Sequence, residues 1–330
     1  MKTRPPVRPI SPRALIFSIA VALGALLASA GPSRAAAFVP GEILVVQENN
    51  NSVQRYSATG TLLQTYFGLG PGPIVIGAAL TPDGNLLIAS GPTNSSSAVI
   101  YSPGGAQITS FPLTGNVNAG DVSVLPNGTF AVSDGLGNAV RFWNQAGTLL
   151  RSVTLNTGPS FNQLIAPNGS TVGSDGSLYV LGFNSFNVAR FDSGGNVLSL
   201  FPLGFRPGDL VMSPLDGTLW VTGTEDTLVH HFTTGGIDLG SFASGMGPGF
   251  DGIALAADNN SLYVASQNNT VVKHFALNGS LLGSFNVINP AGVKYLTVVP
   301  NAAPTPEPGR ATLLLGGLAL LATRRGRASA

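Results

Sequence analysis

Short runs in which hydrophobic and polar residues alternate recur along most of the chain, and each run ends at a turn signal. Ser52–Tyr56 and Thr270–Phe275 show this alternation, which is typical of β-strands with one buried face. An aromatic residue closes each such run, namely Tyr56, Tyr101, Trp143, Phe191, Phe232 and Phe275. A glycine follows four residues later, at Gly60, Gly105, Gly147, Gly195, Gly236 and Gly279, with spacings of 45, 42, 48, 41 and 43 residues. Because another apolar run follows each glycine, the sequence predicts one β-hairpin repeated six times.

A second turn lies upstream in five of these repeats and introduces a further apolar strand. These turns are Asp83-Gly84, Asn127-Gly128, Asp175-Gly176, Asp216-Gly217 and Asn259-Asn260. Another short run precedes most of them, as at Ile253–Ala256. Each period therefore holds four strands, which is the content of a β-propeller blade.

The two ends of the repeat region predict how the ring closes. The first repeat starts at Gly41–Val46 and lacks an innermost strand, whereas the last ends with an unpaired run, Val293–Val299. Pairing of that run beside Ile43–Val46 would complete the first blade and remove the exposed edges. We therefore predict an all-β, six-bladed β-propeller over residues 38–302, with an open β-solenoid as the alternative. Within residues 157–174, both Phe161–Ile165 and Ser170–Val172 fit the inner strand of the fourth blade.

The N-terminus has the pattern of a secretory signal peptide over residues 1–37. A basic stretch at Lys2–Arg13 precedes the apolar run Ala14–Ala28, and small residues follow, with Ala35 and Ala37 as the predicted cleavage signal. An uncleaved membrane anchor is the alternative, although the apolar run is shorter than the roughly 20 residues that a span needs.

The C-terminus carries three features in order after a Pro-rich linker over residues 303–310. These are Pro306-Glu307-Pro308, the apolar run Ala311–Ala322, and a basic tail with Arg324, Arg325 and Arg327. Residues 303–330 resemble the PEP-CTERM sorting signal of Gram-negative bacteria. The resemblance implies recognition by exosortase-type machinery, transient anchoring in the inner membrane by residues 311–330, and a final location in the cell envelope, at the surface or outside the cell. The apolar run would span only about 18 Å as a helix, which suits a temporary anchor; a degenerate signal or an ordinary amphipathic tail are the alternatives.

Charge and cysteine content exclude several classes of function. Between Phe38 and Gly309 the chain has seven basic and all fifteen acidic residues, a net charge of −8. Nucleic-acid binding is therefore not expected, because clustered Lys and Arg supply most of that affinity. The absence of cysteine excludes disulfides, thiol catalysis and Cys-ligated zinc.

The segment Val132–Phe142 resembles an NHL repeat, in which an Asp, a Gly-Asn pair and an Arg-hydrophobic step lie between two strands. In NHL proteins and the related gluconolactonase-like propellers, six blades enclose a channel. The resemblance implies either an enzyme with a metal in that channel or a propeller that only binds a partner.

Few residues suggest catalytic chemistry. Asp121, Asp209 and Asp251 each lie next to a glycine at the start of a predicted inner strand. They are the candidate ligands for Ca²⁺, which prefers oxygen donors, and turn-capping is their alternative role. No other cofactor is indicated. His230, His231 and His274 are predicted to be solvent-facing and away from the channel, because arginine holds the same position as the last two in sister repeats.

These features favour an exported, non-enzymatic propeller that acts as a binding scaffold for a protein, glycan or matrix partner. The alternative is a Ca²⁺-dependent, lactonase-like hydrolase or lyase that uses the channel.

Overall fold

The computed structural model describes residues 37–67, 75–90, 96–115, 118–155, 163–249, 251–288, 290 and 292–301, and the side chains of Val75, Ile76 and Asp251 lie outside this description. The signal and sorting residues, apart from Ala37, also lie outside it. The described ranges contain no helix with the length and apolar composition that a membrane span requires.

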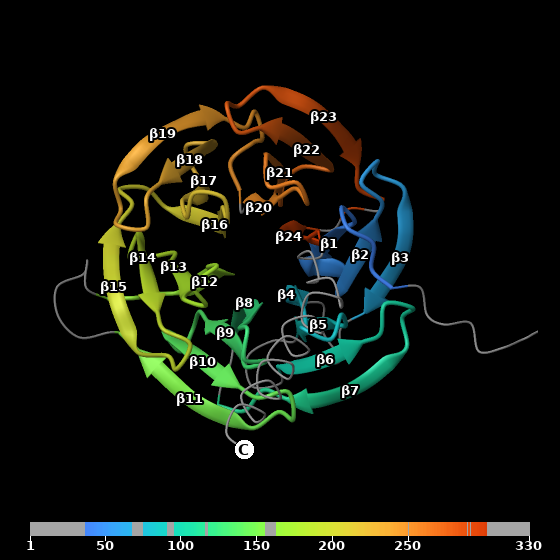
Figure 1. Ribbon diagram of the computed structural model, residues 1–330, viewed down its shortest axis with the longest axis vertical. Coiled ribbons are helices and arrows are strands. Elements are labelled where there is room, and N and C mark those ends of the chain that lie inside the picture. Colours follow the sequence, from blue (N-terminus) through green and yellow to red (C-terminus); the bar gives the residue numbers. More distant parts are fainter. Residues whose placement is uncertain are drawn as a thin grey trace, which may run out of the picture. The chain divides into compact units, whose positions relative to one another are not determined.

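Six four-stranded antiparallel sheets form a ring around a central axis (Figure 1). From channel to rim, blade 1 contains β24 (Val293–Val298), β1 (Ile43–Gln47), β2 (Ser52–Tyr56) and β3 (Leu62–Phe67). Blade 2 contains β4 (Val75–Leu80), β5 (Leu86–Ser90), β6 (Ser97–Tyr101) and β7 (Gln107–Pro112). Blade 3 contains β8 (Ala119–Val124), β9 (Phe130–Asp134), β10 (Ala139–Trp143) and β11 (Leu149–Thr154).

The remaining blades follow the same order. Blade 4 contains β12 (Pro167–Val172), β13 (Leu178–Gly182), β14 (Asn187–Phe191) and β15 (Val197–Pro202). Blade 5 contains β16 (Pro207–Met212), β17 (Leu219–Gly223), β18 (Leu228–Phe232) and β19 (Asp238–Ala243). Blade 6 contains β20 (Asp251–Leu255), β21 (Ser261–Ser266), β22 (Val271–Ala276) and β23 (Leu281–Asn286). A 3-10 turn (η1, Glu48–Asn50) follows β1. The predicted six-bladed propeller is therefore confirmed.

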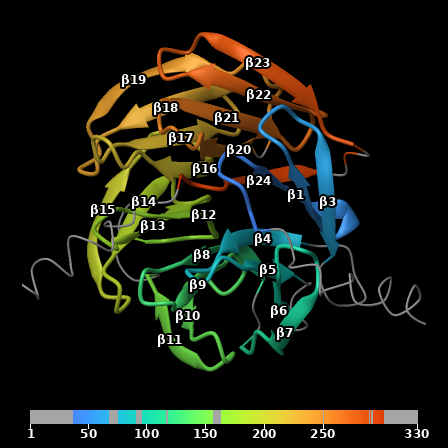
Figure 2. The ribbon, with the colours of Figure 1, turned by 45° about the vertical axis from the view of Figure 1, so that its right-hand side comes forward.

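The last strand completes the first blade, as predicted. In Figures 1 and 2, β24 lies beside β1, and Leu296 pairs with Val45 in an antiparallel ladder. Just beyond the ladder, the backbone N–H of Gly41 donates to the carbonyl of Val299 at 2.9 Å. In blade 4 the inner strand is β12, which contains Ser170–Val172; of the alternative Phe161–Ile165, residues 161 and 162 lie outside the described part of the chain.

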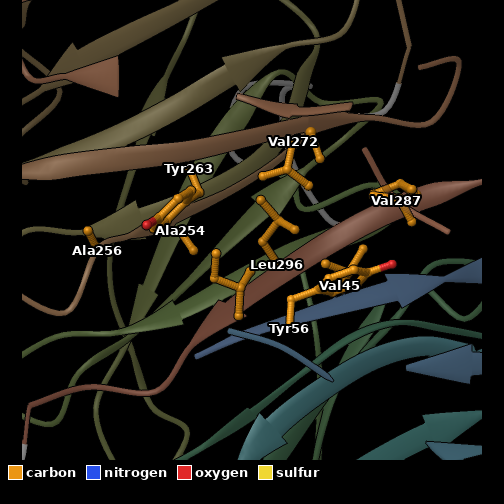
Figure 3. Close-up of a cluster of buried hydrophobic side chains, with 11 residues drawn as sticks. Val45, Tyr56, Ala254, Ala256, Tyr263, Val272, Val287 and Leu296 are labelled. Atoms are coloured by element: carbon orange, nitrogen blue, oxygen red, sulfur yellow. The ribbon is translucent and has the colours of Figure 1, made fainter. Parts of the chain in front are cut away.

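The hydrophobic core consists of six clusters, each between two neighbouring blades. Figure 3 shows the cluster that joins blade 6 to blade 1, where Val272 and Tyr263 pack with Leu296 and Tyr56. The aromatic residue that closes each third strand lies in or against one of these clusters, which explains its recurrence in the sequence. Burial between the blades thus makes ring closure part of the core.

The recurring turn glycines have two physical causes. All six adopt a left-handed backbone conformation, such as φ +80° at Gly147, which disfavours any residue with a Cβ. In addition, a Cβ at Gly147 would lie 2.5 Å from the ring of Phe111, a residue of the preceding blade. The turn therefore has to be compact so that one blade can pack against the next.

The rim strand of every blade carries the same bulge, so that two of its residues face one residue of the third strand. The extra residues are aliphatic and 48–57% exposed, namely Leu63, Ile108, Leu150, Leu198, Leu239 and Leu282. A bulge twists a free edge and interrupts its ladder, which hinders pairing with another chain.

The strand order gives the disc two different faces. One face carries the tight turns between first and second and between third and fourth strands, and we name it the turn face. The opposite face carries the loops between second and third strands and the crossovers between blades, and we name it the loop face. Because Gly41 and Val299 are hydrogen-bonded to each other, both ends of the domain lie at the turn face.

Candidate functional site in the central channel

Glycine alternates with a larger polar residue at one level of the six inner strands. The register of the ladders places Gly77, Asp121, Gly169, Asp209, Gly252 and Tyr295 at this level, in order around the ring. Each glycine makes room for the residue of the next blade. A Cβ at Gly77 would lie 2.8 Å from Oδ1 of Asp121, and one at Gly169 would lie 2.6 Å from Oδ1 of Asp209. We name these six residues the Gly/polar layer.

Asp121 links blade 3 to blade 4. Its Oδ2 accepts a hydrogen bond from the backbone N–H of Ser170 at 2.9 Å and another from the Ser170 hydroxyl at 2.8 Å. The hydroxyl oxygens of Ser170 and Ser123 are also 2.8 Å apart, which extends the network along β8. Asp121 is only 6% exposed. The carboxyl group therefore binds two strands together where neither can form a ladder with the other.

Asp209 makes the equivalent link from blade 5 to blade 6. Its Oδ2 accepts from the backbone N–H of Ile253 at 3.1 Å, and its Oδ1 accepts from the N–H of Leu210 at 2.8 Å. In both links the donor across the blade boundary directly follows a glycine of the layer. The two aspartates thus satisfy buried backbone amides, whose unpaired state would be costly.

Tyr295 forms the third link of the layer. Its hydroxyl donates to Oδ1 of Asn168, which joins blade 1 to blade 4. The neighbouring Lys294 contacts Oε1 of Glu48 at 3.2 Å, and the Gln267 amide donates to Oε2 of Glu48 at 2.9 Å. An ion pair therefore lies beside the polar layer in blade 1.

Burial changes the proton affinity of the layer. It raises the pKa of Asp121 from 3.8 to about 7, against the opposing effect of the hydrogen bonds from Ser170 and Val122. Burial and the nearby charge of Asp121 together raise the pKa of Asp209 well above its ordinary value. The pKa of Tyr295 is also raised, by burial and then by the two carboxylates. Near neutral pH this layer can hold a proton that a solvated aspartate would release.

A cavity of about 400 Å³ extends from the Gly/polar layer toward the turn-face ends of the inner strands. Asp121, Asp209 and Tyr295 lie at its inner end, and Gly173 and Pro300 at the other. The walls between them are largely Ala, Val, Leu and Met side chains. Ser123, Thr171, Ser174, Asn259 and Thr297 also line it, so polar groups occur along the whole cavity. A cavity of this volume that presents both apolar and polar groups has the general form of a small-molecule site.

The three predicted calcium ligands are not equivalent. Asp121 and Asp209 share the Gly/polar layer, whereas Asp251 precedes its glycine and lies one position earlier in the register. The side chain of Asp251 lies outside the described part of the chain. Within the described part, no three His, Asp or Glu side chains gather as metal ligands would. The calcium site stays a prediction, and the oxygens of Asp121 and Asp209 already accept hydrogen bonds.

The histidines lie on third strands, away from the inner strands of the channel. His230 is buried, which corrects the expectation that it faces solvent, whereas His231 and His274 are partly exposed. His231 stacks on Trp220 with ring centroids 3.9 Å apart, and its Nε2 is 2.7 Å from Oγ1 of Thr218. His274 stacks in the same way on Tyr263. The cause is cross-strand pairing, because each histidine lies directly opposite its aromatic partner on the second strand. Burial lowers the pKa of both rings.

Sequence reasoning missed Tyr295, Asn168 and Ser170 as members of the channel network. One signal was available in the sequence: glycine and a bulky polar residue alternate at the same position of successive inner strands. It could be recognised only by aligning all six repeats to the residue.

The solved structures that resemble this chain agree with the fold described above, whereas the comparisons assign the chain to no family. No family model matches the chain, and no curated protein matches it. Among solved structures, a protein of unknown function from Desulfotomaculum acetoxidans is 18% identical, with a TM-score of 0.60 over 81% of this chain and 88% of that one. Virginiamycin B lyase from Staphylococcus aureus is 18% identical, with a TM-score of 0.53 over 67% and 73%. A chain of the nidogen/laminin complex is 16% identical, with a TM-score of 0.61 over 79% and 99%.

At these identities the likeness establishes the architecture alone. The chain is a six-bladed β-propeller whose channel contains a layer of linked polar side chains.

Proposed function

We propose that this chain is an exported, non-enzymatic β-propeller that binds a protein, glycan or matrix partner through its loop face. In this proposal, residues 1–37 direct export, and the PEP-CTERM-like segment delivers the protein to the cell envelope, the surface or the medium after transient anchoring.

The observation that supports the proposal is the position of the two chain ends. Gly41 and Val299 are hydrogen-bonded at the turn face, so the segments that precede and follow the domain both start there. A membrane anchor at residues 311–322 would keep the turn face toward the membrane, because residues 302–310 reach about 30 Å at full extension. The loop face would then point away, and loops on a rigid scaffold are common binding surfaces.

The channel favours binding over catalysis for a structural reason. The carboxyl groups of Asp121 and Asp209 already accept hydrogen bonds from neighbouring blades, so they hold the ring together. A general acid or base has to contact the proton of a substrate. A carboxyl group that is engaged in hydrogen bonds between blades is less free to do so, and this argues against a catalytic role for the two aspartates.

Single cysteines in this Cys-free chain test the proposal in cells. Asn184 is exposed on the loop face and Asp83 on the turn face, so Asn184→Cys and Asp83→Cys form a matched pair. We expect a membrane-impermeant maleimide to label Asn184→Cys in intact cells or spheroplasts, and Asp83→Cys more slowly while the protein is anchored. Deletion of residues 304–330 should equalise the two rates and move the protein out of the envelope fraction. Labelling of Asn184→Cys only after lysis would place the protein in the cytoplasm and contradict the proposal.

One observation favours the hydrolase or lyase alternative, namely the pKa of about 7 for Asp121 beside a 400 Å³ cavity. A group with that pKa is suited to proton transfer at neutral pH. Calcium-dependent melting separates the two functions, because a ligand that binds only the folded state raises its stability. We expect no shift with millimolar Ca²⁺ or Mg²⁺. A rise that disappears in Asp121→Ala would favour the metal-dependent enzyme.

A further inference from the structure

Two phenylalanines, an arginine and a glutamate form a compact group on the loop face of blades 4 and 5. We name Phe183, Phe186, Arg206 and Glu225 the Phe–Arg cluster. Phe183 and Phe186 belong to the loop between β13 and β14, Arg206 to the crossover into β16, and Glu225 to the loop between β17 and β18. Three separate segments therefore supply one small surface.

The guanidinium of Arg206 is the centre of the cluster. Its Cζ lies 5.1 Å from the ring centroid of Phe183 and 5.5 Å from that of Phe186, within the range of cation–π contacts. Its Nη1 donates to Oε1 of Glu225 at 2.7 Å. The side chains of Arg206 and Glu225 are 36% and 70% exposed, and Phe186 is 38% exposed. Apolar ring surface, hydrogen-bond donors and a carboxylate acceptor thus reach solvent side by side.

The surrounding backbone holds the cluster in place. The N–H of Thr224 donates to the carbonyl of Arg206 at 2.9 Å, and the N–H of Phe186 donates to the carbonyl of Gly182 at 2.8 Å. The ring of Phe205, which precedes Arg206 in the chain, stacks on His230 with centroids 3.8 Å apart. Because these contacts exist without a ligand, binding would cost little reordering.

Phe186 has a backbone conformation that its side chain disfavours. Its φ is +54°, in the left-handed region that bulky residues rarely adopt. The same position, directly before the third strand, is Asn51 with φ +55° in blade 1 and Asn138 with φ +47° in blade 3. Asparagine tolerates this conformation, so the fold itself does not call for phenylalanine here. Strained residues that a local rule disfavours tend to mark functional sites.

We infer that the Phe–Arg cluster is a binding subsite for an uncharged carbohydrate chain, which rests on the proposed function and specifies its partner. A sugar ring offers an apolar C–H face that can lie on Phe186, and adjacent hydroxyls that both donate and accept. Arg206 supplies donors and Glu225 an acceptor next to that ring. The charges of Arg206 and Glu225 cancel, and the net charge of −8 between Phe38 and Gly309 disfavours anionic polymers.

Affinity electrophoresis tests this assignment on the full chain in a nonionic detergent. Native gels contain hydroxyethyl cellulose, galactomannan or dextran as neutral probes, and alginate as an anionic probe. We expect retardation by at least one neutral polymer and none by alginate. Phe186→Asn should raise the dissociation constant for the polymer at least about fivefold, in line with the loss of one aromatic contact. Phe186→Tyr keeps the ring and should bind as the wild type does.

Thr227→Asn is the matched control, because Thr227 holds the equivalent position of blade 5 with φ +61° and carries no ring. It should bind as the wild type does. No retardation in any neutral gel, or equal retardation of Phe186→Asn, would overturn the inference. A peptide selected by display on the wild type and lost with Phe186→Asn, without polysaccharide binding, would assign the cluster to a protein partner instead. Cysteine labelling in cells tests export and orientation separately, so failure of the two proposals can be distinguished.

Discussion

Replacement of Asp121 by asparagine should change how the stability of the propeller depends on pH. The substitution keeps the shape of the side chain and an oxygen that can accept from the N–H of Ser170, but it removes the ionisable group. Any pH dependence that the variant loses can therefore be assigned to this carboxyl group and to its effect on the nearby Asp209.

The pKa of Asp121 gives the magnitude. It rises from 3.8 to about 7 on folding, so the folded state binds this proton more tightly than the unfolded chain. The resulting stabilisation is fully present below about pH 4 and is lost as the pH rises through 7. Roughly three pKa units at about 1.4 kcal/mol each correspond to about 4 kcal/mol. Removing the charge of Asp121 should also lower the pKa of Asp209, which increases the difference between variant and wild type.

Urea unfolding of residues 38–302 at intervals between pH 4 and pH 8 measures this difference. Trp143 and Trp220 are buried and report unfolding by fluorescence. The free energy of unfolding of the wild type minus that of Asp121→Asn should fall by about 4 kcal/mol across this range. The difference cancels other acids, such as Asp175, whose pKa is lowered by hydrogen bonds to Ser177 and whose effect has the opposite sign.

Parallel pH profiles of wild type and variant would refute the reasoning, because they would mean that Asp121 ionises alike in the folded and unfolded states. If the unfolding free energy of the wild type minus that of the variant grew with pH, the carboxylate would be stabilised by a positive charge or a bound cation. That result would favour the calcium-dependent alternative.

Three further substitutions, two of them paired with a control substitution, have expected effects on stability, all measurable by urea unfolding of residues 38–302. Leu296→Ala, in the closing strand, should lose about 2–4 kcal/mol, whereas Leu282→Ala on the exposed rim should change stability by less than about 0.5 kcal/mol; equal effects would contradict closure as part of the core. Gly147→Ala should lose at least about 1 kcal/mol, because φ is +80° and the new Cβ would meet a ring of the preceding blade; a neutral result would show that this turn can relax. Phe186→Asn should keep the fold and gain up to about 1 kcal/mol from relief of its backbone, with a gain of similar size for Thr227→Asn, and a loss would mean that the ring is structural.

A gain in stability together with a loss of binding would be a specific signature for Phe186. Most substitutions at structural positions reduce stability, and few improve it. Blades 1 and 3 supply the comparison within the same chain, since they hold Asn51 and Asn138 at the equivalent position.

The sequence by itself determined the architecture of this protein. Alternating strands, turn glycines such as Gly147 and the aromatics four residues before them are local signals, and their sixfold recurrence specifies a blade without reference to distant residues. The missing inner strand of the first repeat and the unpaired run after the last repeat were enough to predict that β24 would close the ring, because an open edge is unfavourable.

Only the tertiary structure decided which side chains meet in the channel. Tyr295 contacts Asn168 across 127 positions of the chain, and Asp121 contacts Ser170 across 49, because the ring brings one level of every inner strand together. Whether a residue lies at that level depends on a difference of one position in the strand register. This difference separates Asp251 from Asp121 and Asp209, although all three lie beside a glycine. The alternation of a strand locates its buried face, but its exact register is set by packing against the neighbouring blades.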